Sequence, residues 1–458
     1  MDTPCSNQIF TLLNQIEMKK IQIHLMILGL TVLMMSCEGF LDEKPNKSLL
    51  VPETVSEFEA LIDNYDRINS TPVLPFVYAD EYVTTKSNWD NFSPWVQRAY
   101  TWSMTPDELD DSVLDFWILY RKINTANVVL DKISENPAWN TNDINRLKAK
   151  SLFWRAHGYF ELAVLYLPIP GKEGYSDDAK LPYRTSGGFG EPANWKSGSE
   201  VFPLIISDLQ EALSLLPDQT PYPTQPSRFA AHALLARIHL YLGNFELAKA
   251  EAEKVLEGNF SLLDYKNLGM EAPFPVSIFN SETVLFTNMA VQSTVSGNNV
   301  AFINPELVNS YEERDLRGRF LVRNSDGNFY FKGSYISRQD VFSGIALDEI
   351  FLLLAEANTR LGNTAEGLNL LNQLLETRML DFKELDSNSP TQVLDWVLDA
   401  RKKSLLFRGQ RWADMKRLSV LEDKGKTVIR KLGDETLNLI LRQENMVVKI
   451  PRREIELQ

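Results

Sequence analysis

The residues most suited to chemistry are aromatic side chains crowded between Thr71 and Trp102. Eight of these 32 residues are aromatic, or 25%, against 10% for the whole chain. Prolines at positions 72, 75 and 94 disfavour a regular buried helix here. Aromatic faces in irregular segments suit sugar rings, whose C–H groups pack on an indole or phenol face. The eight rings are Phe76, Tyr78, Tyr82, Trp89, Phe92, Trp95, Tyr100 and Trp102.

A few polar residues accompany these rings, as expected for a ligand site. Asn88, Asp90 and Asn91 flank Trp89 and could hydrogen-bond ligand hydroxyls. We therefore predict ligand contacts at Trp89, Trp95, Asn88, Asp90, Asn91 and Tyr82. The alternative is that the rings anchor the segment to a core, which we favour for Tyr100 and Trp102 and leave open for the others. Trp195, beside Asn194, is a weaker ligand candidate.

Signals for catalysis or metal binding are weak. The chain has four histidines, and His232 and His239 are seven residues apart on a helical face, too far for one metal site. The glycine-rich stretch 187–190 is followed by Pro192 and lacks the strand-then-helix context of a phosphate loop. We predict no catalytic residue, no metal ligand and no cofactor.

Composition limits the class of protein and the kind of partner that are possible. The chain has 458 residues, 44% hydrophobic and 24% charged, which is ordinary for a globular protein with a large core. The formal charge of −14 disfavours nucleic acid as a partner, because binding phosphates requires a basic surface. Cys5 and Cys37 are the only cysteines, so the fold must be held by packing rather than by disulfides.

The N-terminal region has the pattern of a secretory signal. Met18-Lys19-Lys20 is a short positive start, and Ile21 to Met35 is an apolar run that is too short to span a bilayer comfortably. We predict that 1–36 is an upstream extension and signal peptide, with Met18 as the true start. Leu33-Met34-Met35-Ser36 before Cys37 resembles a bacterial lipobox. We expect Cys37 to carry lipid, with 37–51 as anchor and tether; an incidental cysteine is the alternative.

The elements that must position the aromatic segment are helical. Apolar residues recur at helical spacing in 115–133, and 149–167 forms a second long helix that ends at Pro168. Ser199-Glu200 has the pattern of a capped helix start that leads to Leu216. "LARIHLYLGN" at 235–244 matches "LAEANTRLGN" at 354–363, and each is followed by another helix. This is a helix-turn-helix of the tetratricopeptide kind.

We therefore predict a mainly α fold over 52–458, a superhelical scaffold of helical pairs with long irregular inserts. The pairs cover about 115–168, 200–257, 346–378 and 391–420. The inserts cover about 71–112, 168–197 and 258–343, with a short strand at 283–286 and a less regular C-terminal stretch from Lys424. Because loops on a rigid scaffold commonly carry function, the ligand site should lie in the inserts.

Four stretches together resemble the SusD/RagB family of outer-membrane nutrient-binding lipoproteins of Bacteroidetes-type bacteria. They are "CEGFLDEKPNKSLLVPETVSEFEALIDNYD", "WILYRKINTANVVLDKI" with "AKSLFWRAHGYFELAVLYLPIP", "VFPLIISDLQEALSLLP" with "SRFAAHALLARIHLYLGNFELAKAEAEKVL", and "RKKSLLFRGQRWADMKRL" with "KIPRREI". In the last stretch, Ala400, Ser404 and Arg408 stand where the family usually has glutamates, which leaves the ion pairs of this segment open.

The resemblance implies a SusD-like protein that is not an enzyme. It would be anchored by lipid to the outer membrane and surface-exposed, and would act as a lid on a SusC-like TonB-dependent transporter. Its ligand would be an oligosaccharide or, as in RagB-like variants, a peptide. Two other readings stay open: a tetratricopeptide-type scaffold that binds only proteins, and a lipid-anchored hydrolase.

Overall fold

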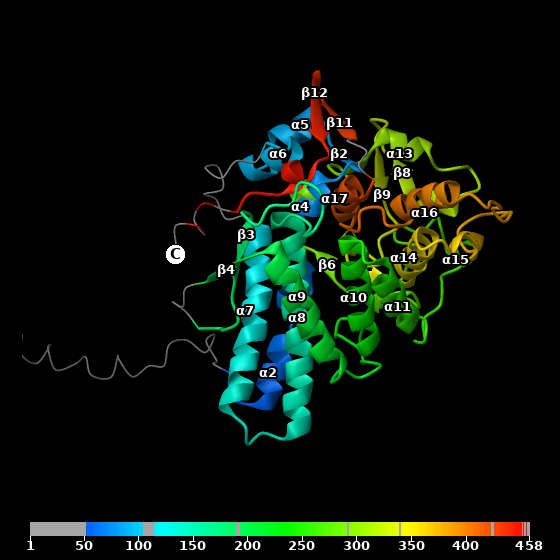
Figure 1. Cartoon of the computed structure of the whole chain (residues 1–458). Coiled ribbons are helices and arrows are strands. Elements are labelled where there is room, and N and C mark those ends of the chain that lie inside the picture. The colour runs from blue at the N-terminus through cyan, green and yellow to red at the C-terminus, as the bar shows by residue number, and fades with distance from the viewer. Residues whose placement is uncertain are drawn as a thin grey trace, which may run out of the picture. The chain divides into compact units, whose positions relative to one another are not determined.

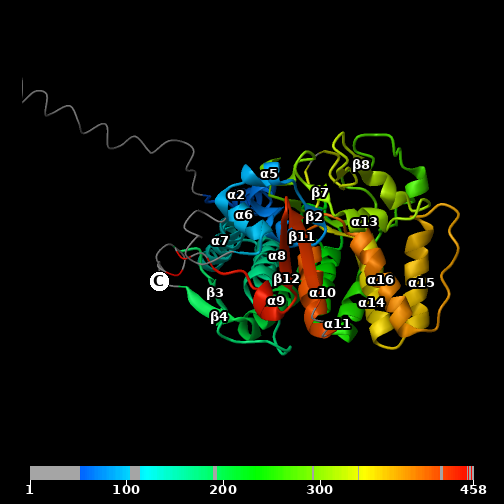
Figure 2. The same cartoon turned by 90° about the horizontal axis from the view of Figure 1, so that it is seen from above.

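The computed structural model describes residues 52–103, 114–188, 193–290, 293–338, 340–422 and 426–450, with Arg452 and Ile455. The predicted signal peptide, Cys37 and the whole tether lie outside these residues. The elements described below belong to the unit Val55–Gln458. Figures 1 and 2 show them from two directions.

Long helices pack side by side in a row. α7 (Leu114–Glu135) and α8 (Thr141–Tyr166) form the first pair, and α2 (Val55–Ile62) packs against both. α9 (Gly198–Leu213) packs on α8, and α10 (Arg228–Leu242) on α9. The row continues through α11 (Phe245–Val255), α14 (Leu347–Arg360), α15 (Thr364–Glu376) and α16 (Pro390–Ser404), while α17 (Arg411–Leu421) packs on α10 (Figure 1).

The repeated Leu-Gly-Asn motif marks two helix ends. Gly243 follows α10 with φ of +77°, and Gly362 follows α14 with φ of +85°. Glycine adopts this left-handed conformation without the steric cost that a Cβ would bring, so the chain can turn directly into α11 and α15. Ala230, Ala233 and Ala236 of α10 are buried, and their small side chains allow neighbouring helices to approach closely.

The predicted start of the helix at Ser199 is two residues late. α9 begins at Gly198, and Ser197 is its N-cap, whose backbone N–H donates to Glu200 Oε2 at 3.0 Å. Pro203 therefore lies inside the helix rather than in its first turn. The reciprocal use of Ser and Glu three residues apart is a capping box, which satisfies backbone donors that a helix start leaves free.

The first insert is more regular than predicted. It contains three short helices: α4 (Leu74–Tyr78), α5 (Lys86–Asp90) and α6 (Pro94–Tyr100). The prolines that we read as helix breakers stand at or next to the starts of α4 and α6, where the missing N–H is not needed. β1 (Ser70–Thr71) and β2 (Tyr82–Val83) connect the helices.

Small two-stranded sheets fasten the inserts. β1 pairs in parallel with β6 (Asn288–Met289), and β2 pairs antiparallel with β7 (Phe302–Ile303). The second insert is a hairpin of β3 (Lys180–Tyr183) and β4 (Asn194–Ser197). The predicted strand at 283–286 is β5 (Thr283–Leu285), paired with β10 (Ile345–Ala346). β8 (Leu321–Arg323) pairs with β9 (Phe329–Phe331). The third insert also contains η2 (Tyr265–Asn267), α12 (Ser293–Ser296), α13 (Pro305–Asn309) and η3 (Leu316–Phe320).

The C-terminal stretch is also more regular than predicted. β11 (Thr427–Leu432) and β12 (Glu435–Ile440) form a six-pair antiparallel hairpin, followed by η4 (Gln443–Met446). The hairpin lies near α5 and α6 at the top of Figure 1. Arg430, Leu432 and Leu439 are buried, so one face of the hairpin covers the first insert while the other meets solvent.

Candidate functional site

Helix α5 carries most of the predicted ligand residues. Thr85 caps it by accepting the Asn88 N–H on its hydroxyl at 3.1 Å. Trp89 is partly exposed, and its indole Nε1 donates to the Gln97 carbonyl at 3.2 Å. Lys86 Nζ lies 4.9 Å from the centre of the same ring. The indole is therefore held in one orientation, by a hydrogen bond on one edge and a cation over one face.

Polar groups surround this indole. Asn88 Nδ2 donates to the Asn299 carbonyl at 2.9 Å, and Asn91 Nδ2 donates to the Ser87 carbonyl at 2.8 Å. Both bonds use the NH₂ group of the amide, so neither of them occupies the amide oxygen. Asp90 is exposed and paired with Lys86. The side-chain oxygens around Trp89 can accept hydrogen bonds from a ligand rich in hydroxyl groups.

Two predicted ligand residues belong to the core instead. Tyr82 is fully buried; its ring lies 4.7 Å from that of Phe76, and its hydroxyl donates to the Val295 carbonyl at 3.2 Å. Trp95 keeps 8% exposure. The prediction of ligand contacts is corrected for Tyr82 and Trp95, because a ring enclosed by protein offers no face for stacking. Tyr100 is buried, as expected.

A partly buried ion pair, Asp80–Arg411, connects the first insert to the last helices. Asp80 accepts two hydrogen bonds from the Arg411 guanidinium, at 2.7 and 2.8 Å. Burial alone would raise the pKa of Asp80, but Arg411 and Lys402 outweigh it and hold the pKa below its usual range. The segment that leads into β2 and α5 is thus anchored 331 residues away along the chain.

Glu81 supports an unusual turn. Its Oε1 accepts the backbone N–H of Phe407 at 3.0 Å, and Phe407 has φ of +63°, which is rare for a bulky residue. Burial, and then the negative charge of Asp80, raise the pKa of Glu81 to about 8. Glu81 is therefore protonated at neutral pH and holds the backbone between α16 and α17 without burying a charge.

Arg430 locks the hairpin onto the first insert. Its guanidinium donates to the carbonyls of Val77 at 3.1 Å and Ala79 at 2.7 Å, and also to the carbonyl of Tyr100. It lies 4.2 Å from the ring centres of both Tyr100 and Trp102. Burial lowers the pKa of Arg430 to about 10, which leaves it charged at neutral pH.

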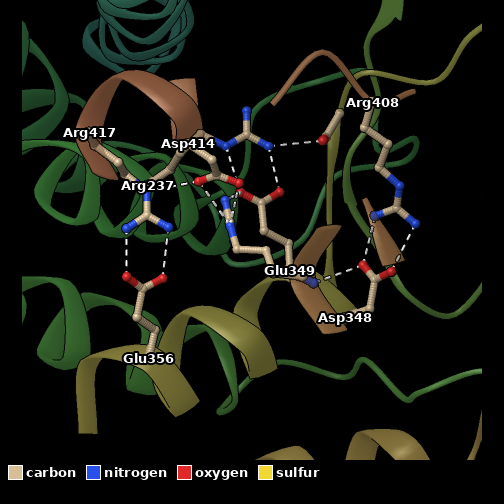
Figure 3. Close-up of polar contacts among 9 residues, drawn as sticks. Arg237, Asp348, Glu349, Glu356, Arg408, Asp414 and Arg417 are labelled. Atoms are coloured by element: carbon tan, nitrogen blue, oxygen red, sulfur yellow. Dashed lines mark hydrogen bonds and ion pairs between the residues drawn. The ribbon is translucent and has the colours of Figure 1, made fainter. Parts of the chain in front are cut away.

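Beneath the insert, the helical pairs enclose a network of charges (Figure 3). Three of its guanidinium–carboxylate pairs are bidentate and buried, with N–O distances between 2.6 and 2.9 Å. The pairs are Arg237–Glu349, Arg408–Asp348 and Arg417–Glu356. Arg401 and Arg417 both contact Asp414 and outweigh its burial, so its pKa falls to about 2.

The three residues that stand where the family usually has glutamates contact other groups. Arg408 pairs with Asp348 and lies 4.3 Å from the ring centre of Tyr335. Ser404 Oγ and the Ala400 carbonyl both accept hydrogen bonds from Arg317, at 2.9 and 3.3 Å. One ion pair, Arg408–Asp348, and two hydrogen bonds from Arg317 therefore connect these positions to partners about 60 to 90 residues away.

The three histidines of the described residues, His157, His232 and His239, are buried or have a polar partner. His232 Nδ1 lies 2.6 Å from Glu251, and His157 Nδ1 lies 3.2 Å from Lys122 Nζ. Burial, and then the charge of Lys122, lower the pKa of His157 well below its usual range. Within the described ranges, no three side chains of His, Cys, Asp or Glu gather as metal ligands would. Nor does that part of the chain contain a helix long and apolar enough to cross a bilayer.

Comparison with known proteins identifies the class. Residues 39–240 match a family model described as "Starch-binding associating with outer membrane", and residues 247–448 match the model of the SusD family. Together the two models cover nearly the whole of the described chain. The chain belongs to the SusD/RagB family, which confirms the resemblance seen in the sequence.

Particular relatives agree with this placement. SusD-like protein P38 of Formosa agariphila is 23% identical, and the match covers 88% of this chain and 92% of the relative. A SusD superfamily protein of Bacteroides vulgatus has a TM-score of 0.73 at 21% identity, covering 89% and 97% of the two chains. A SusD-like carbohydrate binding protein from the same species has a TM-score of 0.68 at 19% identity, covering 89% and 97%. These structures confirm the mainly α, SusD-like fold.

Proposed function

We propose that this protein binds an oligosaccharide nutrient at the cell surface, and that α5 carries a contact surface for it. The observation that carries the proposal is the Trp89 indole, partly exposed and oriented by Gln97 and Lys86, with amide and carboxylate oxygens beside it. The C–H groups of a sugar ring can pack on the apolar indole face, and its hydroxyl groups can donate to the nearby acceptors. The family description and the names of the carbohydrate-binding relatives support this class of ligand.

The proposed role is capture without catalysis. Lipid on Cys37 would hold the protein on the outer membrane, and a SusC-like TonB-dependent transporter would be its partner. In this scheme the protein is a lid on the transporter. Opening exposes the ligand surface, and closure delivers the ligand to the barrel. The contacts of Arg411 with Asp80 and of Arg430 with Ala79 fix the segment that leads to α5. They support a rigid lid, because a surface that moves as one body presents its ligand in a fixed orientation.

Calorimetry on the wild-type protein tests the ligand class. Titration with hexasaccharides of the malto-, cello-, xylo-, manno- and laminari- series is expected to give saturable binding of at least one. Binding of unstructured peptides instead would favour a RagB-like role. No binding of any sugar, together with a stable protein complex from the native membrane, would favour a protein-binding scaffold. Release of a reducing end during the titration would show a hydrolase.

A fractionation experiment tests the anchor. Cys37→Ala is expected to release the protein from the membrane fraction of its own host while its ligand affinity stays unchanged, because acyl chains supply the membrane affinity. Continued membrane association of the variant would contradict the lipoprotein proposal. It would leave the glycan proposal standing.

A further inference from the structure

A groove lies at the opposite end of the helices from α5. It consists of two hollows of about 640 and 280 Å³ that share Gln219 and Thr220, in the connection between α9 and α10. The larger hollow is also lined by Asn142 and Asn145 at the start of α8, which is at the bottom of Figure 1, whereas α5 and α6 are at the top. We call it the Gln219 groove. Its size is within the usual range of small-ligand sites.

Aromatic rings stand beside the groove. Phe279 lines the smaller hollow, and Tyr222 lies 6.3 Å from it between ring centres. The two are 40% and 58% exposed. Tyr222 stands between Pro221 and Pro223, which restrict the backbone around it. Two exposed rings next to each other and beside a hollow form a small apolar surface, which is a feature of ligand-binding grooves.

Phe279 is held rigidly in this place. Its ring packs edge-on against buried Phe286, with ring centres 5.0 Å apart at 83°. Its backbone has φ of +53°, in the left-handed region that costs a bulky residue about 1 kcal/mol or more. Conformations of this kind persist only where the surrounding structure imposes them, and they gather at ligand sites. The ring is thus fixed at the surface rather than free to fold away.

Unsatisfied polar groups line the same groove. Asp63 accepts Lys150 and Gln225 on Oδ2, at 2.6 and 2.9 Å, while its buried Oδ1 has no partner among the described residues. The hydroxyl of Thr283, a residue that is 5% exposed, likewise lacks a partner in the described chain. A buried polar atom without a hydrogen bond costs about 1–3 kcal/mol. The Asp63 side chain as a whole keeps 21% exposure at the larger hollow, so its carboxylate group can accept a hydrogen bond from a ligand hydroxyl.

The charges of the groove favour a neutral ligand. Its three cationic side chains already have carboxylate partners: Arg146 pairs with Glu59, Lys150 with Asp63 and Arg228 with Asp218. Phosphates and acidic peptides are recognised by cations that are free to form such pairs. The exposed amides of Gln219 and Asn259 offer neutral donors and acceptors instead.

We propose that the Gln219 groove is a second glycan-binding site, for a neutral oligosaccharide, with Tyr222 and Phe279 as stacking platforms and Asp63 and Gln219 as hydroxyl partners. It is separate from the surface on α5 and does not depend on it. Two sites at opposite ends of one rigid body allow a long polysaccharide or two neighbouring chains to be held at once, which raises the apparent affinity without any new contact.

The test uses the full chain and hydrogen–deuterium exchange with the same hexasaccharides. At least one sugar is expected to protect residues 219–225 and 277–284 in the wild-type protein. Tyr222→Ala and Gln219→Ala should each abolish this protection and weaken binding at the groove roughly five- to tenfold. Trp117→Ala, which removes another exposed ring (54%) on α7, should leave it unchanged.

The outcomes separate the two sites. If Trp89→Ala removes protection of 86–91 but not of 219–225, both sites exist. If Tyr222→Ala and Gln219→Ala change nothing while Trp89→Ala abolishes all binding, the second site is wrong and the proposed function stands. If no sugar in the panel protects 219–225, or if peptides protect it and sugars do not, the groove is not a glycan site.

Discussion

The charged network between the helical pairs and the core-facing side of the first insert are both buried, but they are held differently. In the network, guanidinium groups face carboxylates directly, as in Arg408–Asp348. In the insert, Arg430 and Glu81 contact backbone groups, and rings fill the remaining space. Ion pairs between side chains depend on both residues and so specify how two helices pack. Hydrogen bonds to backbone groups fix the path of a loop and do not depend on the side chains of that loop. The exposed residues of α5 can therefore vary with the ligand while the scaffold stays the same.

Breaking a pair in the network should have the largest effect on stability. Arg408→Met leaves Asp348 buried without its partner, and we expect a loss of about 3–5 kcal/mol in the free energy of unfolding. Urea denaturation followed by circular dichroism measures it. Arg314→Met, which removes an exposed pair with Glu312, is the matched control and should cost less than about 1 kcal/mol. Equal losses for the two variants would contradict the role given to the network.

Breaking the hairpin contact should loosen the insert more than the scaffold. Arg430→Met leaves the carbonyls of Val77, Ala79 and Tyr100 without this donor, and we expect a loss of roughly 2–3 kcal/mol. Hydrogen exchange should accelerate in residues 74–100 and stay slow in α10 and α14. Arg430→Lys keeps the charge but not the fork of donors, so an intermediate effect is expected. Uniform acceleration throughout the chain would show that insert and scaffold unfold together.

The buried carboxyl group of Glu81 in the insert should make the free energy of unfolding depend on pH. Burial and Asp80 raise the folded pKa of Glu81 to about 8, above the ordinary value. Between these two values the folded state holds a proton that the unfolded state has released, so the contribution of Glu81 to stability falls as pH rises toward 8. Glu81→Gln removes this dependence while keeping an acceptor for the Phe407 N–H.

Melting temperatures of Glu81→Gln and wild type, compared from pH 5 to pH 8, check this sign. As pH rises, the melting temperature of the variant should increase relative to that of the wild type. At pH 8 the difference should correspond to at least about 1 kcal/mol in the free energy of unfolding. Glu356→Gln, within the network, is not expected to show the same trend, because Arg417 outweighs burial and holds the pKa of Glu356 below its usual range. A constant difference between Glu81→Gln and wild type would mean that Glu81 is ionised in the folded protein.

Changing the ring on α5 should have the smallest effect on stability. Trp89 is partly exposed and makes one side-chain hydrogen bond, to Gln97. Trp89→Ala should cost about 1 kcal/mol. The thermal unfolding curve measures this, and Trp102→Ala is the contrast within the same insert, since Trp102 packs on Arg430 and donates to the Tyr78 carbonyl. A larger loss for Trp89→Ala than for Trp102→Ala would give Trp89 a structural role.

The sequence predicted local structure better than long-range contact. Helix ends at Gly243 and Gly362 were visible, because a repeated Leu-Gly-Asn motif and apolar spacing are local signals. The β11–β12 hairpin was missed although apolar residues alternate with polar ones around Gly433. The burial of Tyr82 could not be predicted, because its neighbours Val295 and Ile303 are more than 200 residues away.

The candidate site shows the same limit. The Asn-Trp-Asp-Asn stretch drew attention to Trp89 through composition alone, and the structure gives a partly exposed ring among polar groups there; ligand contact at this ring stays a prediction. The anchoring partners Arg411 and Arg430 lie more than 300 residues further along the chain. Tyr222 was also missed, although a ring between two prolines in a polar stretch is a local sign of an exposed aromatic side chain.

The most direct test of the central claim is calorimetric titration of Trp89→Ala beside Trp117→Ala, with the sugar that the wild type binds. Both tryptophans lie close to a basic side chain, Lys86 and Arg121, at 4.9 and 4.5 Å from the ring centre. We predict that Trp89→Ala weakens binding at the α5 surface roughly tenfold or more, while Trp117→Ala binds as the wild type does. Unchanged affinity in Trp89→Ala would contradict the assignment of the ligand surface to α5.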